Sequence, residues 1–295
     1  MNDKMINKYI KIVDEISLKY NYTDNVKHLL YIILPAFVIK YGMQNESLII
    51  DCLNNIPIII TGNENPKIQA MYTSQPYNDN GIKTKKQILL NRYKNIPFMQ
   101  LIDNIVHELN HAVNSYKNEI IIEDNYFCLR TGLTKVKYDK KTLNIINKSK
   151  NYVLEEIINS KQTEIIIEII KELANSNINN IYIQNTLYAI KNSIKDKYIS
   201  DSYYGLKYFC KTLLDNKTFL LTLENLRLNG YIDDIESWFN NIYGSDLGYK
   251  NLIDTLYKLK EIQNKKVLFK KQKMKDLAIE LINISNTFNN NCNLK

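Results

Sequence analysis

Five consecutive residues carry the side chains best suited to chemistry: His107-Glu108-Leu109-Asn110-His111, in a chain with only three histidines. The two histidines are four residues apart, so on a helix they project from one face, about one turn apart. Two imidazoles at that separation can share one metal ion. Glu108 is angled to reach a metal-bound water rather than the metal, and there it can serve as a general base. The pattern predicts a hydrolytic metal site.

A catalytic zinc ion takes three protein ligands and leaves one position for water, so a third ligand is needed. The extended pattern HExxHxxGxxH is excluded, because Asn114 and Lys117 replace its glycine and its last histidine. His28 lies on a predicted N-terminal helix, and we interpret it as a surface or half-buried side chain. A carboxylate from a later helix remains as the source.

The best source of this carboxylate is the segment from Leu154 to Glu164. On a helix, Glu156 shares a polar strip with three further residues: Asn159, Ser160 and Thr163. We predict Glu156 as the third ligand. Other acids of the same helix stay open as alternatives: Glu155, the close rival, then Glu164 and Glu168.

The elements before the motif are predicted to be two helices and a small sheet. Apolar residues recur at helical spacing from Lys4 to Lys19 and from Asp24 to Tyr41, and Pro35 is expected to bend the second helix. Pro and Gly residues then separate three β-prone runs: Ile58 to Thr61, Gln69 to Thr73 and Gln87 to Leu90. The motif helix is expected to start at Pro97 and to run through Tyr116.

After the motif, Glu119 to Ile122 and Phe127 to Tyr138 are expected to form strands or a hairpin. From Leu143 onward the pattern predicts helices: Val153 to Ala174, Ile181 to Asp196, Tyr203 to Leu214, Thr218 to Leu228, Ile232 to Tyr243 and Asn251 to Ile284. The Asn-rich tail, Asn286 to Lys295, is expected to fray.

The composition agrees with a helix-dominated α+β fold. The 295 residues are 45% hydrophobic, which is enough for a buried core, and eight Gly and five Pro are too few for an all-β chain full of tight turns. We predict N-terminal helices over 1–45, a catalytic core over 46–200 and a helical C-terminal lobe over 201–295, with one continuous domain as the alternative.

The charge is +8, from 39 Lys and Arg against 31 Asp and Glu. Only Arg92, Arg130 and Arg227 are arginines, so the guanidinium contacts that specify phosphates and bases are nearly absent. We interpret the surplus as a solvated lysine surface and expect no nucleic-acid partner. The Lys-rich stretch from Lys258 to Lys275 is interpreted in the same way, as one face of an amphipathic helix.

The cysteines are far apart and form no CxxC pair, which favours reduced thiols: Cys52, Cys128, Cys210 and Cys292. No signal-peptide pattern is visible at the N-terminus. The longest apolar stretch, Leu29 to Ile39, contains Pro35 and is shorter than the ~20 residues of a membrane span. These features predict a cytoplasmic protein without a membrane span.

The HELNH helix, followed by a glutamate-bearing helix, resembles the gluzincin branch of the zincin metallopeptidases, the HExxH-plus-Glu class. The resemblance covers roughly Gln87 to Glu168. It implies one Zn²⁺ per chain bound by His107, His111 and Glu156, with Glu108 as the general base. The implied activity is hydrolysis of a peptide or protein substrate through a metal-activated water. The alternative is a catalytically inactive zincin-like binding or structural module.

The sequence departs from this family at several positions. A predicted hairpin lengthens the segment between His111 and Glu156. Ser160 stands where thermolysin-like enzymes place an acidic residue, and Ile157 replaces a common glycine. The residue that orients a ligand histidine is therefore left open among Asn159, Thr163 and Glu164.

The family also implies a fold in which a small twisted sheet precedes the motif helix and its edge strand pairs with an extended peptide. Gln87 to Leu90 is the expected edge strand. A donor from the C-terminal lobe would stabilise the oxyanion, and Tyr203 and Tyr204 are candidates. With 22 tyrosines in the chain, packing remains the first expectation for each of them.

Overall fold

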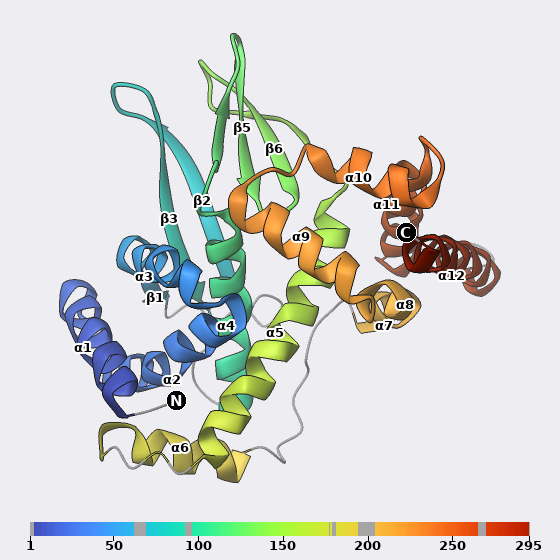
Figure 1. The fold of residues 1–295 in the computed structure, drawn as a ribbon. Coiled ribbons are helices and arrows are strands. Elements are labelled where there is room, and N and C mark those ends of the chain that lie inside the picture. The colour runs from blue at the N-terminus through green and yellow to red at the C-terminus, as the bar shows by residue number, and fades with distance from the viewer. Residues whose placement is uncertain are drawn as a thin grey trace. The chain divides into compact units, whose positions relative to one another are not determined.

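The structure is a computed structural model that describes residues 3–61, 69–91, 96–176, 178, 181–193, 204–264 and 270–294. Of these described residues 67% are helical, and they form two small sheets, so the predicted class, helix-dominated α+β, is confirmed (Figure 1). The chain forms two compact units, described separately below: unit 1 comprises 1–113 and 162–200, and unit 2 comprises 114–161 and 201–295. The units change at 113/114, 161/162 and 200/201, and the division predicted from the sequence, 1–45, 46–200 and 201–295, stays a prediction.

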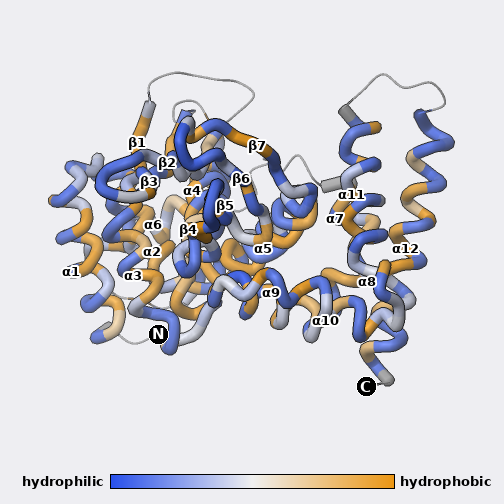
Figure 2. Tube along the Cα trace, turned by 90° about the horizontal axis from the view of Figure 1, so that it is seen from above, coloured by the Kyte–Doolittle hydropathy of each residue, from blue (hydrophilic) through white to orange (hydrophobic). Residues whose placement is uncertain are grey.

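Unit 1 begins with helices: α1 (Asp3–Tyr20), α2 (Asp24–Tyr41), the 3-10 turn η1 (Met43–Asn45) and α3 (Glu46–Asn55). The first two match the predicted segments. Along α1, apolar and polar residues alternate at helical intervals (Figure 2). α2 continues past Pro35 because most of its residues are buried, and packing offsets the lost backbone hydrogen bond. The sequence patterns did not predict α3, whose apolar residues span less than three turns.

In the part of the chain that the structure describes, no single helix is long and apolar enough to cross a membrane. Two neighbouring helical segments, α2 and Met43–Asn55, meet that criterion only as a pair, and they are bent by 116° at the break between them.

The first sheet contains β1 (Ile58–Ile60), β2 (Ala70–Asn78) and β3 (Ile82–Leu90), in the order β1-β3-β2. β2 and β3 form an antiparallel hairpin, and β1 runs parallel to β3 on its other side (Figure 1). The predicted edge strand, Gln87 to Leu90, is therefore wrong: it belongs to the central strand. Its pairing with Ile58–Ile60 covers one side and the β2 hairpin covers the other. The edges of this sheet are β1 and β2.

The helices that carry the predicted chemistry are α4 (Phe98–Ser115) and α5 (Tyr152–Asn175), both close to their predicted ranges. α4 begins directly after Pro97, and its apolar stripe is fully buried at Ile105, Leu109 and Val113. Both helices are continuous across the boundary between the two units. α6 (Ile181–Ser193) completes unit 1.

Unit 2 contains an antiparallel sheet in the order β4-β5-β6-β7: β4 (Ile120–Ile122), β5 (Tyr126–Thr131), β6 (Thr134–Asp139) and β7 (Ile145–Lys148). The first three strands lie where a hairpin was predicted. β7 lies where helix was expected to begin, so that expectation is wrong. All four β7 side chains are exposed, and the strand therefore has no alternation of buried and exposed positions to signal it.

The C-terminal helices of unit 2 are α7 (Tyr204–Phe209), α8 (Lys211–Leu214), α9 (Lys217–Asn229), α10 (Asp234–Tyr243), α11 (Gly248–Asn264) and α12 (Lys270–Leu294). The predicted helix from Tyr203 to Leu214 is interrupted at Cys210, and Tyr203 itself lies outside the described residues. The predicted helix from Asn251 to Ile284 is two helices that lie side by side in both views (Figures 1 and 2). Residues 265–269, in the Lys-rich stretch, lie outside the described residues.

The Asn-rich tail was expected to fray, but it continues α12 to Leu294. Phe288 is fully buried and stacks on Phe239, with the ring centroids 4.5 Å apart. Asn289 donates a hydrogen bond to the carbonyl of Thr212, and Asn291 to that of Tyr243. Tertiary contacts of this kind hold a terminal helix that its own sequence would not sustain.

Candidate metal centre

His107 and His111 lie one turn apart on α4, as their spacing predicts. Their ring centroids are 4.9 Å apart, and the rings meet edge to face at 79°. His111 is buried and His107 half-buried. The opposite side of α4 is packed into the core, so the helix cannot rotate without exposing its apolar stripe.

Glu156 of α5 completes a group of three potential ligands. One ligand atom from each of His107, His111 and Glu156 lies within 4.8 Å of the other two. Within the described ranges, this is the one group of three or more His, Cys, Asp or Glu side chains so arranged. Two imidazole nitrogens and one carboxylate oxygen suit a divalent transition metal, so this group could hold a metal ion.

The rival acid, Glu155, is engaged elsewhere. Its Oε2 accepts a hydrogen bond from the backbone N–H of Leu133 over 2.7 Å, and its Oε1 accepts one from Nη2 of Arg227 over 2.5 Å. Both side chains of this ion pair are almost completely buried. Glu164 and Glu168 are exposed, and Glu168 pairs with Lys171. The structure therefore brings Glu156, and none of its alternatives, to the two histidines.

Glu108 is held by the edge strand of the first sheet. The backbone N–H of Tyr72, in β2, donates to Oε2 of Glu108 over 2.6 Å. Tyr72 pairs with Ile88 of β3, while the flanking pair Gln69–Asn91 is joined by the bond from Asn91 N to Gln69 O. In an antiparallel pair of strands, hydrogen-bonded and non-hydrogen-bonded residue pairs alternate. Gln69 is in a hydrogen-bonded pair, so Tyr72, three residues later, is in a non-hydrogen-bonded pair and its N–H points away from β3. We call this the outward phase of β2.

Asn110, the fourth residue of the motif, ties α4 to two other helices of unit 1. Its Oδ1 accepts a hydrogen bond from the hydroxyl of Tyr41, at the end of α2. Its Nδ2 donates to Oε1 of Gln162, in α5, over 3.4 Å. Asn110 and Gln162 are both buried, so the pairing satisfies polar groups that would otherwise be costly. Nothing in the sequence pattern indicated this role.

The polar strip on α5 supplies further groups beside Glu156. Ser160 and Thr163 are buried, and within the described residues their hydroxyl oxygens have no hydrogen-bond partner. Orphaned buried hydroxyls call for water or an ion nearby, which agrees with a polar site at this position. Asn159 accepts a hydrogen bond from Arg227 over 3.4 Å, and Glu164 is exposed. That one of Asn159, Thr163 and Glu164 orients a ligand histidine stays a prediction.

Two of the three arginines are fully buried in unit 2, a structural role that the sequence patterns did not predict. Arg227 pairs with Glu155, and Arg130 donates to a series of backbone carbonyls: Asn114, Lys117, Asn118, Gly132 and Arg227. Arginine is rare in this chain, where almost all other cationic side chains are lysines. That rarity is the sequence feature from which a structural role of the arginines could have been predicted.

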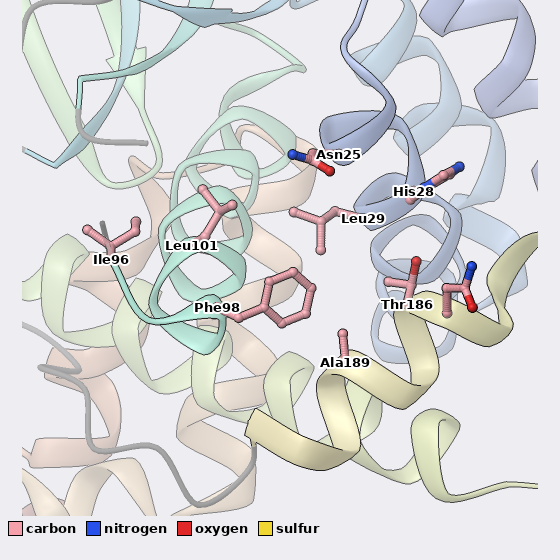
Figure 3. Close-up of a pocket in the computed structure, with 9 residues that line it drawn as sticks. Asn25, His28, Leu29, Ile96, Phe98, Leu101, Thr186 and Ala189 are labelled. Carbon is pink, nitrogen blue, oxygen red and sulfur yellow. The ribbon is translucent and has the colours of Figure 1, made fainter. Parts of the chain in front are cut away.

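His28 stands apart from this group. It is half-buried, with its ring centroid 5.7 Å from that of Tyr31, and it borders a cavity of about 380 Å³ in unit 1. The lining residues are Asn25, His28, Leu29, Ile96, Phe98, Leu101, Asn185, Thr186 and Ala189. Leu29 and Phe98 point into the cavity, while the His28 ring points away from them (Figure 3). The cavity lining includes none of the three potential ligands.

The predicted oxyanion donors are not part of the described site. Tyr203 lies outside the described residues, and Tyr204 begins α7 with a side chain that is also outside them.

No protein-family model matches the chain, and no curated protein or solved structure matches it.

Proposed function

We propose that the chain is a zinc-dependent metallopeptidase of the gluzincin type, with His107, His111 and Glu156 as the zinc ligands. The observation that carries the proposal is the approach of their ligand atoms to within 4.8 Å of one another, with Glu108 next in sequence to His107. This donor set leaves a fourth position for water, as catalytic zinc sites do. When bound there, zinc lowers the pKa of a water molecule and polarises the substrate carbonyl.

Glu108 is assigned the proton transfers. The Tyr72 N–H occupies its Oε2, so Oε1 is the atom that takes a proton from the attacking water and passes it to the leaving nitrogen. A carboxylate already held in place needs little reorganisation during the reaction, which favours catalysis. General acid–base catalysis by such a group contributes about 10²- to 10⁴-fold.

The substrate class that fits is an extended peptide segment. β2 is an edge strand, and its backbone reaches Glu108 through Tyr72. A peptide laid along the part of β2 beyond Tyr72, whose outward N–H already bonds Glu108, would bring its own backbone next to the general base, since strand addition aligns a bound peptide with a sheet edge. We further infer a cytoplasmic location, because none of the four cysteines forms a disulfide.

The test measures metal content by elemental analysis and peptide hydrolysis with a library of quenched fluorescent peptides. We expect about one zinc per chain in the native protein and in Glu108→Gln, with hydrolysis lower by about 10²-fold or more in the variant. Glu168→Gln, which changes an exposed acid on α5 that pairs with Lys171, is the matched control and should behave as the native protein.

Other outcomes discriminate among the alternatives. A native protein that cannot be loaded with stoichiometric zinc contradicts the proposal. Iron in place of zinc also contradicts it, because two histidines and one carboxylate are also a ligand set of iron(II) oxygenases. Zinc without hydrolysis of any peptide supports the alternative, an inactive zincin-like binding module.

A further inference from the structure

The first turns of α5 are fixed by Arg227. Its Nη2 donates to Oε1 of Glu155 and to Oδ1 of Asn159, which is one turn further along the helix. The second oxygen of Glu155 accepts from Leu133, so both oxygens of the carboxylate are held. Consecutive residues of a helix are about 100° apart, and holding Glu155 therefore sets the direction in which Glu156 leaves the helix.

The last turn of α4 is fixed by Arg130. The guanidinium donates to the carbonyl of Asn114, in that turn, over 2.8 Å, and to two carbonyls just after the helix, that of Asn118 over 3.4 Å and that of Lys117. The final carbonyls of a helix have no partners within it and form its negative end, so the guanidinium satisfies the Asn114 carbonyl and is favoured at this position. Asn114 is three residues after His111, and this contact therefore holds the turn next to a potential ligand.

The two arginines are joined to each other. Nη1 of Arg130 donates to the carbonyl of Arg227 over 3.1 Å and to that of Gly132 over 2.9 Å. The N–H of Gly132 donates to Oγ of Ser115, the last residue of α4, over 2.9 Å. We call Arg130, Arg227 and Glu155 the arginine network. It links the end of α4 to the start of α5 entirely within unit 2.

The chemistry of the arginine network points to positioning rather than to stability alone. A buried ion pair costs desolvation, and well-packed apolar residues of similar size are often at least as stable. A guanidinium has five N–H donors in a rigid fork, whereas a lysine is a flexible point charge. Two of the three arginines in this Lys-rich chain are at this place, where several acceptors must be held in fixed directions.

We propose that Arg130 and Arg227 are positioning residues of the metal site. Through Glu155 they hold the first turns of α5, which carries Glu156, and through the carbonyl of Asn114 they hold the last turn of α4, which carries His107 and His111. This inference rests on the proposed zinc site. Partners that orient metal ligands from outside the coordination shell typically change metal affinity by about 10- to 100-fold when removed.

The test compares the zinc affinity of full-length variants, by competition with a chelator, and the visible spectrum of the cobalt-substituted proteins. Arg227→Met removes the donor and leaves the buried carboxylate of Glu155 without the guanidinium that neutralises it, which can prevent folding. The double variant Glu155→Gln/Arg227→Met removes both charges and provides a folded alternative. We expect zinc affinity to fall by about tenfold or more in the folded variants, with a changed cobalt spectrum.

Leu281→Ala is the control for general destabilisation, because Leu281 is a fully buried core residue of α12 in the same unit. It should lower the midpoint of thermal unfolding while leaving zinc affinity and the cobalt spectrum unchanged. A folded double variant with native zinc affinity overturns the positioning role, and so does an equal loss of affinity in Leu281→Ala. A native protein that binds no zinc contradicts the proposed site itself, so the two failures are distinguishable.

Discussion

The backbone N–H of Tyr72 donates a 2.6 Å hydrogen bond to Oε2 of Glu108, so an edge strand of the first sheet holds the carboxylate next to His107. Hydrogen bonds to a charged acceptor are shorter and stronger than neutral ones. Because this N–H points away from β3, the bond to Glu108 uses a group that the sheet itself does not need. The sheet and the motif helix are thus joined at the atom assigned to proton transfer.

Tyr72→Pro removes this N–H while leaving the β2–β3 ladder intact. Pro76 is four residues after Tyr72 on β2 and is therefore in the same outward phase. A proline at such a position of an edge strand removes no hydrogen bond between β2 and β3. We expect kcat for peptide hydrolysis to fall by about tenfold or more, with zinc content unchanged, because Glu108 loses the donor that orients it.

Tyr72→Ala is the matched control for this change, because it removes the side chain and keeps the N–H. Its kcat should stay closer to that of the native protein than the kcat of Tyr72→Pro does. Equal losses in the two variants would place the effect in the tyrosine side chain and contradict the role given to the backbone.

Local patterns in the sequence were sufficient for the amphipathic helices α1, α4 and α5 and for the pair of histidines. Apolar residues at a spacing of three and four define α1, α4 and α5, because each buries one face against a core. The i, i+4 spacing likewise places His107 and His111 on one face whatever lies around α4. Both inferences need no knowledge of which elements are neighbours in space.

Long-range contacts decided what the sequence left open. Glu155 and Glu156 are adjacent on α5, and Arg227 separates their roles by pairing with Glu155 from a helix far along the chain. In the same way, the parallel pairing of Ile58–Ile60 makes β3 a central strand, although its own residues look no different from those of an edge. The spacing of residues within one segment cannot predict such contacts, because the partner, Arg227 for Glu155 or Ile58–Ile60 for β3, is in a distant part of the sequence.

Gly132→Ala should strongly destabilise unit 2. Gly132 has a φ of +54°, and an added Cβ would collide with the Glu155 carboxylate. The strained backbone and the disturbed buried ion pair together should lower the free energy of unfolding by about 3 kcal/mol or more, measured by denaturant titration.

Gly244→Ala separates the two causes of that loss. Gly244, in the same unit, is also in the left-handed region, with a φ of +82°, but an added Cβ would make only an ordinary contact with Asn291, at 3.8 Å. This variant should therefore carry only the conformational cost and lose less stability than Gly132→Ala. Similar losses at both positions would mean that the contact with Glu155 adds nothing.

Glu156→Gln should weaken zinc binding more than any change in the arginine network, because it removes a ligand instead of an orienting partner. We expect a loss in zinc affinity greater than the ~100-fold upper range for outer partners, measured by chelator competition. Glu168→Gln, which changes an exposed acid of the same helix, should leave the affinity unchanged. Native affinity in Glu156→Gln would remove this residue from the site.

Glu46 should make the stability of the N-terminal helices depend on pH. Burial acts to raise the pKa of this carboxyl from its ordinary 4.5, but hydrogen bonds from Lys8 and Tyr9 outweigh burial and lower it. Since the folded pKa is below the unfolded one, the stabilisation is present above pH 4.5 and is lost as the pH falls through the folded pKa. Glu46→Gln should cost about 1 kcal/mol at pH 7, and its difference from the native protein should shrink in acid, by denaturant titration at each pH. A difference for Glu46→Gln that stays constant down to strongly acidic pH would contradict the linkage.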